Sequence, residues 1–295
     1  MVLIHGFSGS DSDFDKIREA FLGSTENIRL LVPNTNKGFL RTRCGALAYA
    51  ENVVAEIVRV IMGDEDDGDG DGDGGGLRKL SIIGHSFGGI VARCVAKLLL
   101  DRGIVKRLRP HCFMTFATPH IGVRRPQRSP FNIVFQSVAP LWAGQTGAEL
   151  TLTDDVDTPL LLQMSKGAYI EALQMFQKKI LYGNVFYDIQ VPLTTSTISL
   201  HKNPYRTLES SEIVYEEGTD CVIEREKILS GIDGGIPQDF RSDGKGDLIR
   251  EINRSLNEID WMKYDVLLPM AWLDPHNRMI RHPSVIQHAI SKILK

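Results

Sequence analysis

The chain has 295 residues, of which 42% are hydrophobic, and its formal net charge is −3. This size and composition allow one large α/β core, so a second domain is not required. We expect neither a membrane-spanning helix nor a signal peptide, because no apolar stretch is long enough and the apolar start is too short. The four cysteines are widely spaced, with no C-x-x-C pair and no Cys/His cluster. This pattern favours free thiols in a reducing compartment over disulfides or a metal site.

Apolar runs alternate with amphipathic segments along most of the chain. This alternation predicts an α/β fold with a mostly parallel sheet and helices on both faces. The expected strands are residues 1–4, 28–32, 79–84, 111–117, 180–187 and 264–271. The expected helices are residues 12–21, with Ser12 or Asp13 as cap, 46–62, 87–100, 168–178 and 284–294. Residues 124–162 show no clear period, so we expect irregular structure there.

Residues 63–76 form an acidic tract of glycine and seven acidic residues. A segment of this composition repels itself and has no apolar area to bury. We therefore predict a disordered insertion within a single domain that spans residues 1–295. The aspartate spacing resembles a calcium loop, but the terminal glutamate is missing before Leu77. Weak calcium binding is the lesser alternative.

Residues 84–88 read GHSFG and lie between an expected strand and an expected helix. This Gly-x-Ser-x-Gly pattern in a strand–turn–helix context is typical of a nucleophile elbow. The serine needs a tight, strained turn, which requires neighbours with little side chain. The N-terminus of the following helix then directs free N–H groups at the reacting carbonyl. We predict that Ser86 is a nucleophile.

A nucleophilic serine needs a histidine as general base and a carboxylate that orients it. In this type of sheet the chain order is serine, acid, histidine. Asp188 is the best acid, since it ends an expected strand and precedes Ile189-Gln190-Val191-Pro192. Asp154, Asp155 and Asp157 are rivals in the irregular region, and Asp220 follows no expected strand.

His276 is the best base, because it follows the last expected strand and precedes the closing helix. His282 lies in the same loop and is its rival. The other histidines fall in a helix, in turns beside Ser86 or too early in the chain, namely His288, His5, His85, His111, His120 and His201.

Stabilisation of an oxyanion needs two fixed N–H donors. We predict the backbone amides of Phe87, the residue after the nucleophile, and of Phe7, in the turn after the first strand. Gly6 would allow that turn to approach closely. The alternative is that residues 5–10 are only a tight loop.

Residues 123–165 are rich in apolar side chains, and we predict a lid or a wall of the substrate site there. The candidates for substrate contact are Phe131, Phe135, Leu141 and Trp142. The open alternative is that these apolar residues only cover a pair of helices. Arg124, Arg125 and Arg128 precede this cluster, either as a basic rim for anionic lipid or as plain surface. Nucleic-acid binding is not indicated, because the basic residues are scattered.

The segments VLIHGFSGS, IIGHSFGGIVAR, FATPHIG, YGNVFYDIQVPLTTSTI and DPHNRMIRHPSVIQHAI resemble the "putative serine esterase" (lipase-like) family of α/β hydrolases. The resemblance spans nearly the whole chain. It implies a Ser86–Asp188–His276 esterase or lipase that acts on lipid or acyl esters and is cytoplasmic, with contact to intracellular membranes. Compared with a complete hydrolase sheet, the chain begins at the third strand, so we expect the first strands to be missing.

Together these features predict hydrolysis of a carboxylic ester through an acyl-enzyme on Ser86, with no cofactor and no metal. One alternative is an acyltransferase or thioesterase that uses the same three residues. Another is a catalytically inactive hydrolase-fold module that binds lipid or protein.

Overall fold

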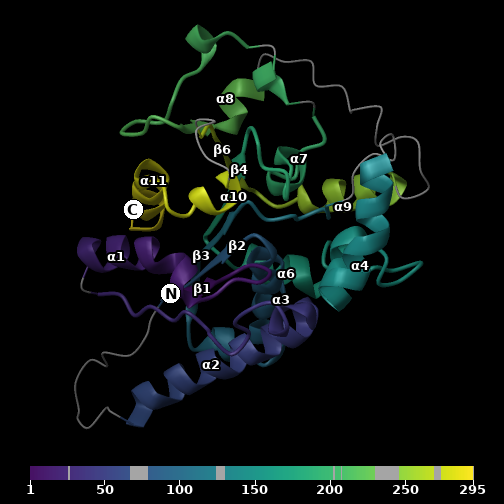
Figure 1. Ribbon diagram of the computed structural model, residues 1–295. Coiled ribbons are helices and arrows are strands. Elements are labelled where there is room, and N and C mark those ends of the chain that lie inside the picture. Colours follow the sequence, from purple (N-terminus) through teal and green to yellow (C-terminus); the bar gives the residue numbers. More distant parts are fainter. Residues whose placement is uncertain are drawn as a thin grey trace.

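The computed structural model describes residues 1–25, 27–66, 79–123, 130–201, 203–206, 208–229, 246–268 and 274–294. In these residues, six strands form one sheet in the order β1-β2-β3-β4-β6-β5 (Figure 1). Neighbouring strands are parallel except β5, which pairs antiparallel with β6. The strands are β1 (Val2–Ile4), β2 (Lys79–His85), β3 (Arg109–Phe116), β4 (Lys178–Asn184), β5 (Val222–Glu224) and β6 (Met262–Val266). The predicted, mostly parallel sheet is confirmed.

Helices connect most of these strands. The α-helices are α1 (Asp15–Ser24), α2 (Ala46–Asp66), α3 (Phe87–Asp101), α4 (Pro130–Thr151), α5 (Leu160–Gln163), α6 (Ala168–Gln174), α7 (Leu193–Ser196), α8 (Arg225–Leu229), α9 (Gly246–Leu256), α10 (Pro275–Arg278) and α11 (Pro283–Leu294). Short 3-10 turns cover Asp11–Phe14, Arg41–Arg43, Ile104–Lys106, Pro204–Arg206 and Ser210–Glu212. No helix among the described residues is both long enough and apolar enough to cross a membrane.

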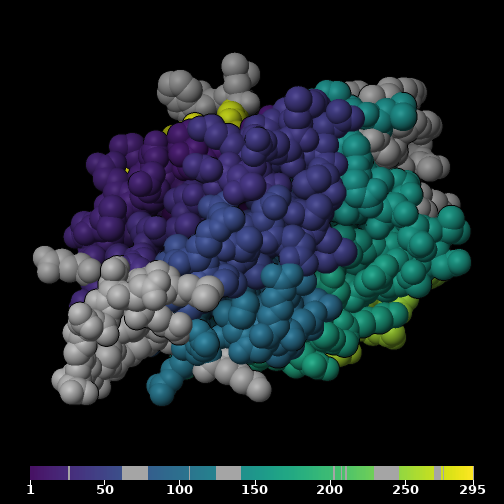
Figure 2. All heavy atoms as spheres, turned by 90° about the horizontal axis from the view of Figure 1, so that it is seen from below, coloured from purple at the N-terminus to yellow at the C-terminus, as the bar shows by residue number. Residues whose placement is uncertain are grey.

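The sheet is buried on both faces, as its first strand illustrates. Val2 and Ile4 pack into the cluster formed with α2, α3, α6 and α9, whereas Leu3 packs into the opposite cluster with α1 and α11. Successive side chains of a strand point to opposite faces, so a strand covered on both sides must be apolar throughout. Figure 2 shows the face on which α2 lies, with residues of α2 across its middle. The prediction of helices on both faces is confirmed.

Two elements near the N-terminus differ from the prediction. Residues 28–32 are not a strand: Leu31 forms a single bridge with Val2, because β1 itself offers only three residues for pairing. The first helix begins later than predicted, after the 3-10 turn. Ser10 is the cap of that turn, and its amide donates to the Asp13 carboxylate at 2.9 Å, so Ser12 and Asp13 are not helix caps.

The region predicted to be irregular contains α4 and α5, so that prediction is wrong. Helix α4 is interrupted at Gly144, where the backbone has φ 60° and ψ −142°. This break shifts the helical phase between the two parts of α4, so no single helical period runs through residues 130–151. Helix α2 extends to Asp66, four residues into the predicted acidic insertion, and residues 67–76 lie outside the described ones.

Candidate active site

Ser86 occupies a sharp turn between β2 and α3. Its backbone has φ 54° and ψ −131°, a conformation that a residue with a side chain adopts only under strain. The end of β3 holds the turn in place: the Ser86 amide donates to the carbonyl of Phe116 at 2.8 Å. The Ser86 carbonyl accepts from the Thr118 hydroxyl at 2.9 Å. These bonds offset the cost of the strained backbone.

The glycines of the turn are required by close backbone contacts. A Cβ atom on Gly88 would lie 2.1 Å from the carbonyl oxygen of Ile4, in β1. A Cβ atom on Gly84 would lie 2.4 Å from the Cα of Gly89, in α3. Only glycine allows β1 and α3 to approach the turn this closely, which explains the Gly-x-Ser-x-Gly spacing.

Asp188 and His276 form a hydrogen bond, with 2.9 Å between Oδ2 and Nδ1, and both side chains are buried. The Asp188 carboxylate follows β4 and accepts further bonds from Asn184 Nδ2 at 2.9 Å and from the Val191 amide at 2.8 Å. Burial alone would raise the pKa of Asp188, but the hydrogen bonds from His276, Asn184 and Val191 keep this pKa below its usual value. Asp188 is therefore an ionised acceptor.

This contact orients the His276 ring. An ionised carboxylate only accepts, so Nδ1 of His276 carries a proton and donates to Asp188. Within the described part of the chain, Nε2 is buried and has no hydrogen-bond partner. Nε2 is thus the ring nitrogen left for proton transfer.

His85, the residue before Ser86, connects the turn to His276. Its Nε2 donates to the His276 carbonyl at 3.1 Å, and the two ring centroids are 4.8 Å apart. Burial, reinforced by His276, lowers the pKa of His85 to about 3, so the ring is neutral. The sequence placed His85 in a turn beside Ser86 and predicted no contact with His276. The structure brings the Asp188–His276 pair directly beside the elbow through this contact.

The turn after β1 lies against Ser86. A Cβ atom on Gly6 would be 2.8 Å from the Ser86 Cβ and 3.2 Å from its Oγ. The backbone amide of Phe87 begins α3 and that of Phe7 follows Gly6. In the described residues, neither amide donates a hydrogen bond. Both predicted oxyanion donors are therefore unoccupied N–H groups near the elbow.

The four predicted substrate-contact residues have different positions. Trp142, in α4, is 59% exposed, and its ring lies 5.3 Å from that of Phe7 and 4.8 Å from that of Phe39. Leu141 is 77% exposed. The side chains of Phe131 and Phe135 lie outside what the structure describes, as do Arg124, Arg125 and Arg128.

The rival acids and bases have other contacts. Asp154 accepts from the Leu160 amide at 2.8 Å, and Asp155 accepts from the amides of Asp157 and Thr158, as expected of turn residues. His288 bonds to the Tyr182 hydroxyl at 2.8 Å. Asp220 and His282 lie together in a separate cluster with Cys221.

Residues 1–199 match the sequence profile of the family described as "Putative serine esterase". The chain belongs to this family. The described part of the chain has the mostly parallel sheet, with helices on both faces, that the sequence predicted. The specific chemistry within this family is addressed below as a proposal.

Two curated proteins of Saccharomyces cerevisiae are similar to this chain over part of their length. "Putative lipase YDL109C" of Saccharomyces cerevisiae is 30% identical over 207 residues, which cover 67% of this chain and 30% of the relative. "Putative lipase ROG1" of the same organism is 26% identical over 206 residues, which cover 67% of this chain and 28% of the relative. The chain thus matches about 30% of the length of these curated relatives.

Solved structures are similar at low sequence identity. The product of the gene lin2722 from Listeria innocua has a TM-score of 0.47 and 11% identity, covering 100% of this chain and 92% of that protein. The monoacylglycerol lipase of Paleococcus ferrophilus has a TM-score of 0.42 and 12% identity, covering 98% and 93%.

Proposed function

We propose that this chain hydrolyses carboxylic esters with apolar acyl groups through an acyl-enzyme on Ser86. One observation carries the proposal: the 2.9 Å bond between Asp188 and His276, attached through His85 to the strained turn that bears Ser86. A serine hydroxyl is a weak nucleophile without such a base. The arrangement supplies a base whose tautomer is fixed and whose free nitrogen is buried beside the elbow.

The proposed reaction has two halves. Ser86 Oγ attacks the ester carbonyl carbon while His276 Nε2 takes the hydroxyl proton, and Asp188 stabilises the resulting imidazolium. His276 then gives that proton to the leaving alcohol, so the C–O bond breaks and the acyl group stays on Ser86. Water attacks the acyl-enzyme with His276 again as base, which releases the acid and restores Ser86.

The negative charge that forms on the carbonyl oxygen needs fixed donors. We assign the backbone amides of Phe7 and Phe87 to this role, because both N–H groups are free and their segments meet at Ser86. Each such donor typically contributes about 3 kcal/mol to stabilisation of the transition state.

The apolar surface beside the elbow supports an apolar substrate. Phe7, Phe39 and Trp142 form an aromatic cluster, and Leu40 next to it is 76% exposed. An exposed apolar surface next to a reactive serine suits an acyl chain, and it also suits contact with the surface of a lipid membrane. We therefore infer a lipid or acyl ester as substrate.

Labelling by a fluorophosphonate probe tests the proposal. We expect wild-type protein to be labelled and to hydrolyse p-nitrophenyl acyl esters, and Ser86→Ala to lose both properties. Ser24→Ala is a matched control, since this exposed serine at the end of α1 only bonds to the Ala20 carbonyl. Folded wild-type protein that is neither labelled nor active would refute the proposal and favour an inactive binding module.

A further inference from the structure

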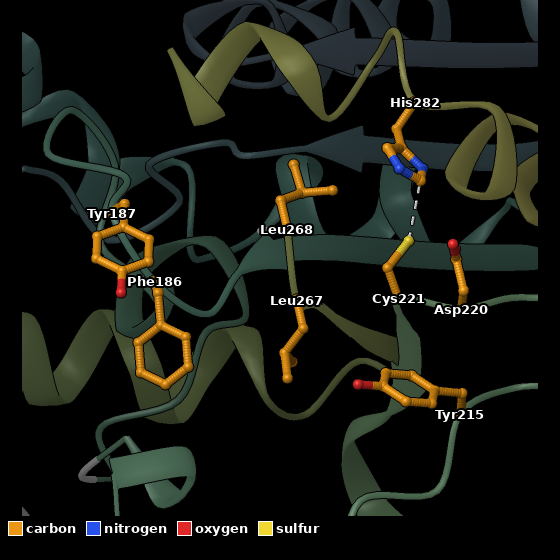
Figure 3. Close-up of a pocket in the computed structure, with 8 residues that line it drawn as sticks. All are labelled: Phe186, Tyr187, Tyr215, Asp220, Cys221, Leu267, Leu268 and His282. Atoms are coloured by element: carbon orange, nitrogen blue, oxygen red, sulfur yellow. Dashed lines mark hydrogen bonds between the residues drawn. The ribbon is translucent and has the colours of Figure 1, made fainter. Parts of the chain in front are cut away.

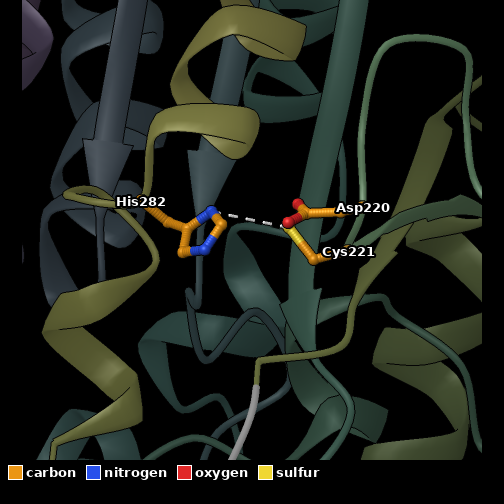
Figure 4. Close-up of side chains that lie close together, drawn as sticks. All are labelled: Asp220, Cys221 and His282. Carbon is orange, nitrogen blue, oxygen red and sulfur yellow. Dashed lines mark hydrogen bonds between the residues drawn. The ribbon is translucent and has the colours of Figure 1, made fainter.

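Three side chains with metal-binding chemistry converge outside the proposed active site. Asp220 and Cys221 directly precede β5, and His282 lies between α10 and α11. One ligand atom from each residue lies within 4.8 Å of the others (Figure 4). Cys221 is buried, His282 is half-buried and Asp220 is exposed, so the cluster extends from the interior to the surface.

The best-defined distance in this cluster fits a tetrahedral metal. Zinc binds sulfur at about 2.3 Å and imidazole nitrogen at about 2.0 Å, which places the two ligand atoms roughly 3.5 Å apart at a tetrahedral angle. Cys221 Sγ and His282 Nδ1 are 3.6 Å apart although the residues are separated by 61 positions in the chain. The two atoms thus have the spacing of one edge of a zinc tetrahedron.

We propose that Asp220, Cys221 and His282 bind a divalent transition metal, zinc in particular. Sulfur, imidazole nitrogen and carboxylate oxygen form a ligand set that suits zinc and disfavours magnesium and calcium, which prefer oxygen ligands alone. A thiolate and a carboxylate would offset the charge of the cation. Three protein ligands leave the fourth position of the tetrahedron for water or another small ligand.

A pocket gives this fourth position access to solvent. All three ligands line a cavity of about 380 Å³, whose other walls include Tyr187, Tyr215 and Leu268 (Figure 3). The volume exceeds the roughly 30 Å³ that a single water occupies. The pocket therefore supplies both an entry path for the ion and room for an outer ligand.

Metal binding at this cluster should release a proton, because a cysteine binds zinc as its thiolate. At present the Cys221 Sγ contacts Nδ1 of His282 at 3.6 Å. Coordination would replace this contact by bonds from both atoms to the ion, and the thiol proton would leave to solvent.

A metal at this position would join distant parts of the chain. His282 bonds through its amide to the Arg278 carbonyl at 2.9 Å, at the end of α10, which carries His276. Coordination would tie this segment to the start of β5. We expect the melting temperature of the protein to rise with metal concentration, since a ligand that binds only the folded state stabilises it.

Cobalt spectroscopy on the full chain tests the proposal, because Co²⁺ replaces zinc and a thiolate ligand gives a charge-transfer band in the near ultraviolet. The protein used for this titration carries Cys44→Ser, so that cobalt cannot bind the exposed thiol of Cys44. The other two cysteines outside the cluster, Cys94 and Cys112, are buried. We expect one cobalt per chain with a thiolate band, displacement by zinc, and release of one proton.

Substitutions then identify the ligands. Cys221→Ser should abolish the band. Asp220→Asn and His282→Ala should each weaken binding at least about tenfold, because even indirect partners of a metal are worth about 10- to 100-fold. His111→Ala, a histidine on β3 bonded to Gln177, is the matched control and should bind normally.

Asp220 is exposed, so we expect Asp220→Asn to fold. Its cobalt affinity therefore tests the proposal even when Cys221→Ser does not fold. Absence of a thiolate band in the folded Cys44→Ser protein would overturn the proposal, as would cobalt bound without that band. A band unaffected by Asp220→Asn and His282→Ala would also overturn it. In that case the contact between Cys221 and His282 is only a hydrogen bond between thiol and imidazole.

Discussion

Glu149 is predicted to make the stability of this protein fall between weakly acidic and neutral pH. Its side chain, in α4, is 4% exposed, and Oε2 accepts from the Ala46 amide at the start of α2 at 2.9 Å. Gln145 Nε2 is its other partner, at 3.4 Å. These two neutral donors do not offset the loss of hydration, so burial raises the pKa of Glu149 from 4.5 to about 7.

The sign and size of the effect follow from the two pKa values. Between 4.5 and about 7 the folded state holds a proton at Glu149 that the unfolded state has released, so stability declines as pH rises through this window. The contribution is complete below pH 4.5 and lost above about pH 7. One pKa unit corresponds to about 1.4 kcal/mol, so Glu149 lowers the free energy of unfolding by up to about 3 kcal/mol across the window.

Glu149→Gln tests this, because the amide keeps the shape of the side chain and its oxygen can still accept from Ala46. We expect urea denaturation to show that the variant is more stable than wild type at pH 8 by up to about 3 kcal/mol, and that the difference shrinks towards pH 5. Glu171→Gln, an exposed glutamate on α6, is the control and should follow the wild-type curve. Parallel curves for wild type and Glu149→Gln between pH 5 and pH 8 would refute the reasoning.

Three further predictions concern the elbow and the site beside it. Asp188→Asn should reduce kcat for p-nitrophenyl esters by about four orders of magnitude, because it removes the charge that orients His276. It should also lower the melting temperature, since His276, Asn184 and Val191 stabilise the ionised carboxylate in the folded state. Asp157→Asn, in an exposed turn, should have no effect, and equal losses of activity would argue against an acid role. Gly88→Ala should destabilise the protein by about 3 kcal/mol or more in the same denaturation assay, because its Cβ would lie 2.1 Å from a β1 carbonyl. Gly23→Ala, with no atom within 4 Å of the new Cβ, should instead be neutral or stabilising, and similar effects of both would contradict the contact. Trp142→Ala should lower kcat/KM for a long-chain ester about tenfold more than for an acetate ester, since about 1.4 kcal/mol of binding is lost; an equal effect on both esters would exclude a contact with the acyl chain.

The sequence indicated the parts of the site that depend on strand ends. Ser86 follows from a five-residue pattern, and Asp188 and His276 follow from chain order in a parallel sheet, where functional side chains collect at the carboxyl ends of the strands. The structure joins Asp188 to His276 by a hydrogen bond, while the catalytic roles of all three residues stay predictions. The contact between His85 and His276 could not be foreseen, because it depends on where the chain returns after β6.

Other features of the structure that the sequence analysis did not predict have separate reasons. Helix α9 has Ile249, Ile252 and Leu256 on one face, and this helical spacing is visible in the sequence itself. Strand β5 has three residues, too few for a recognisable alternation. The cluster of Cys221 and His282 has no local signal at all, since its members are separated by 61 positions and only the fold brings them together.

The hydrogen bond from His85 to the carbonyl of His276 has a mechanical consequence. It links two segments 191 positions apart, so the residue before the proposed nucleophile is bonded directly to the backbone of the proposed base. A displacement of α10 must also break the bond to His85, the last residue of β2 and the neighbour of Ser86. Local opening of the C-terminal segment would therefore displace His276 and loosen the turn that carries Ser86 in the same event. Amide hydrogen exchange in α10 should then change together with exchange at the start of α3.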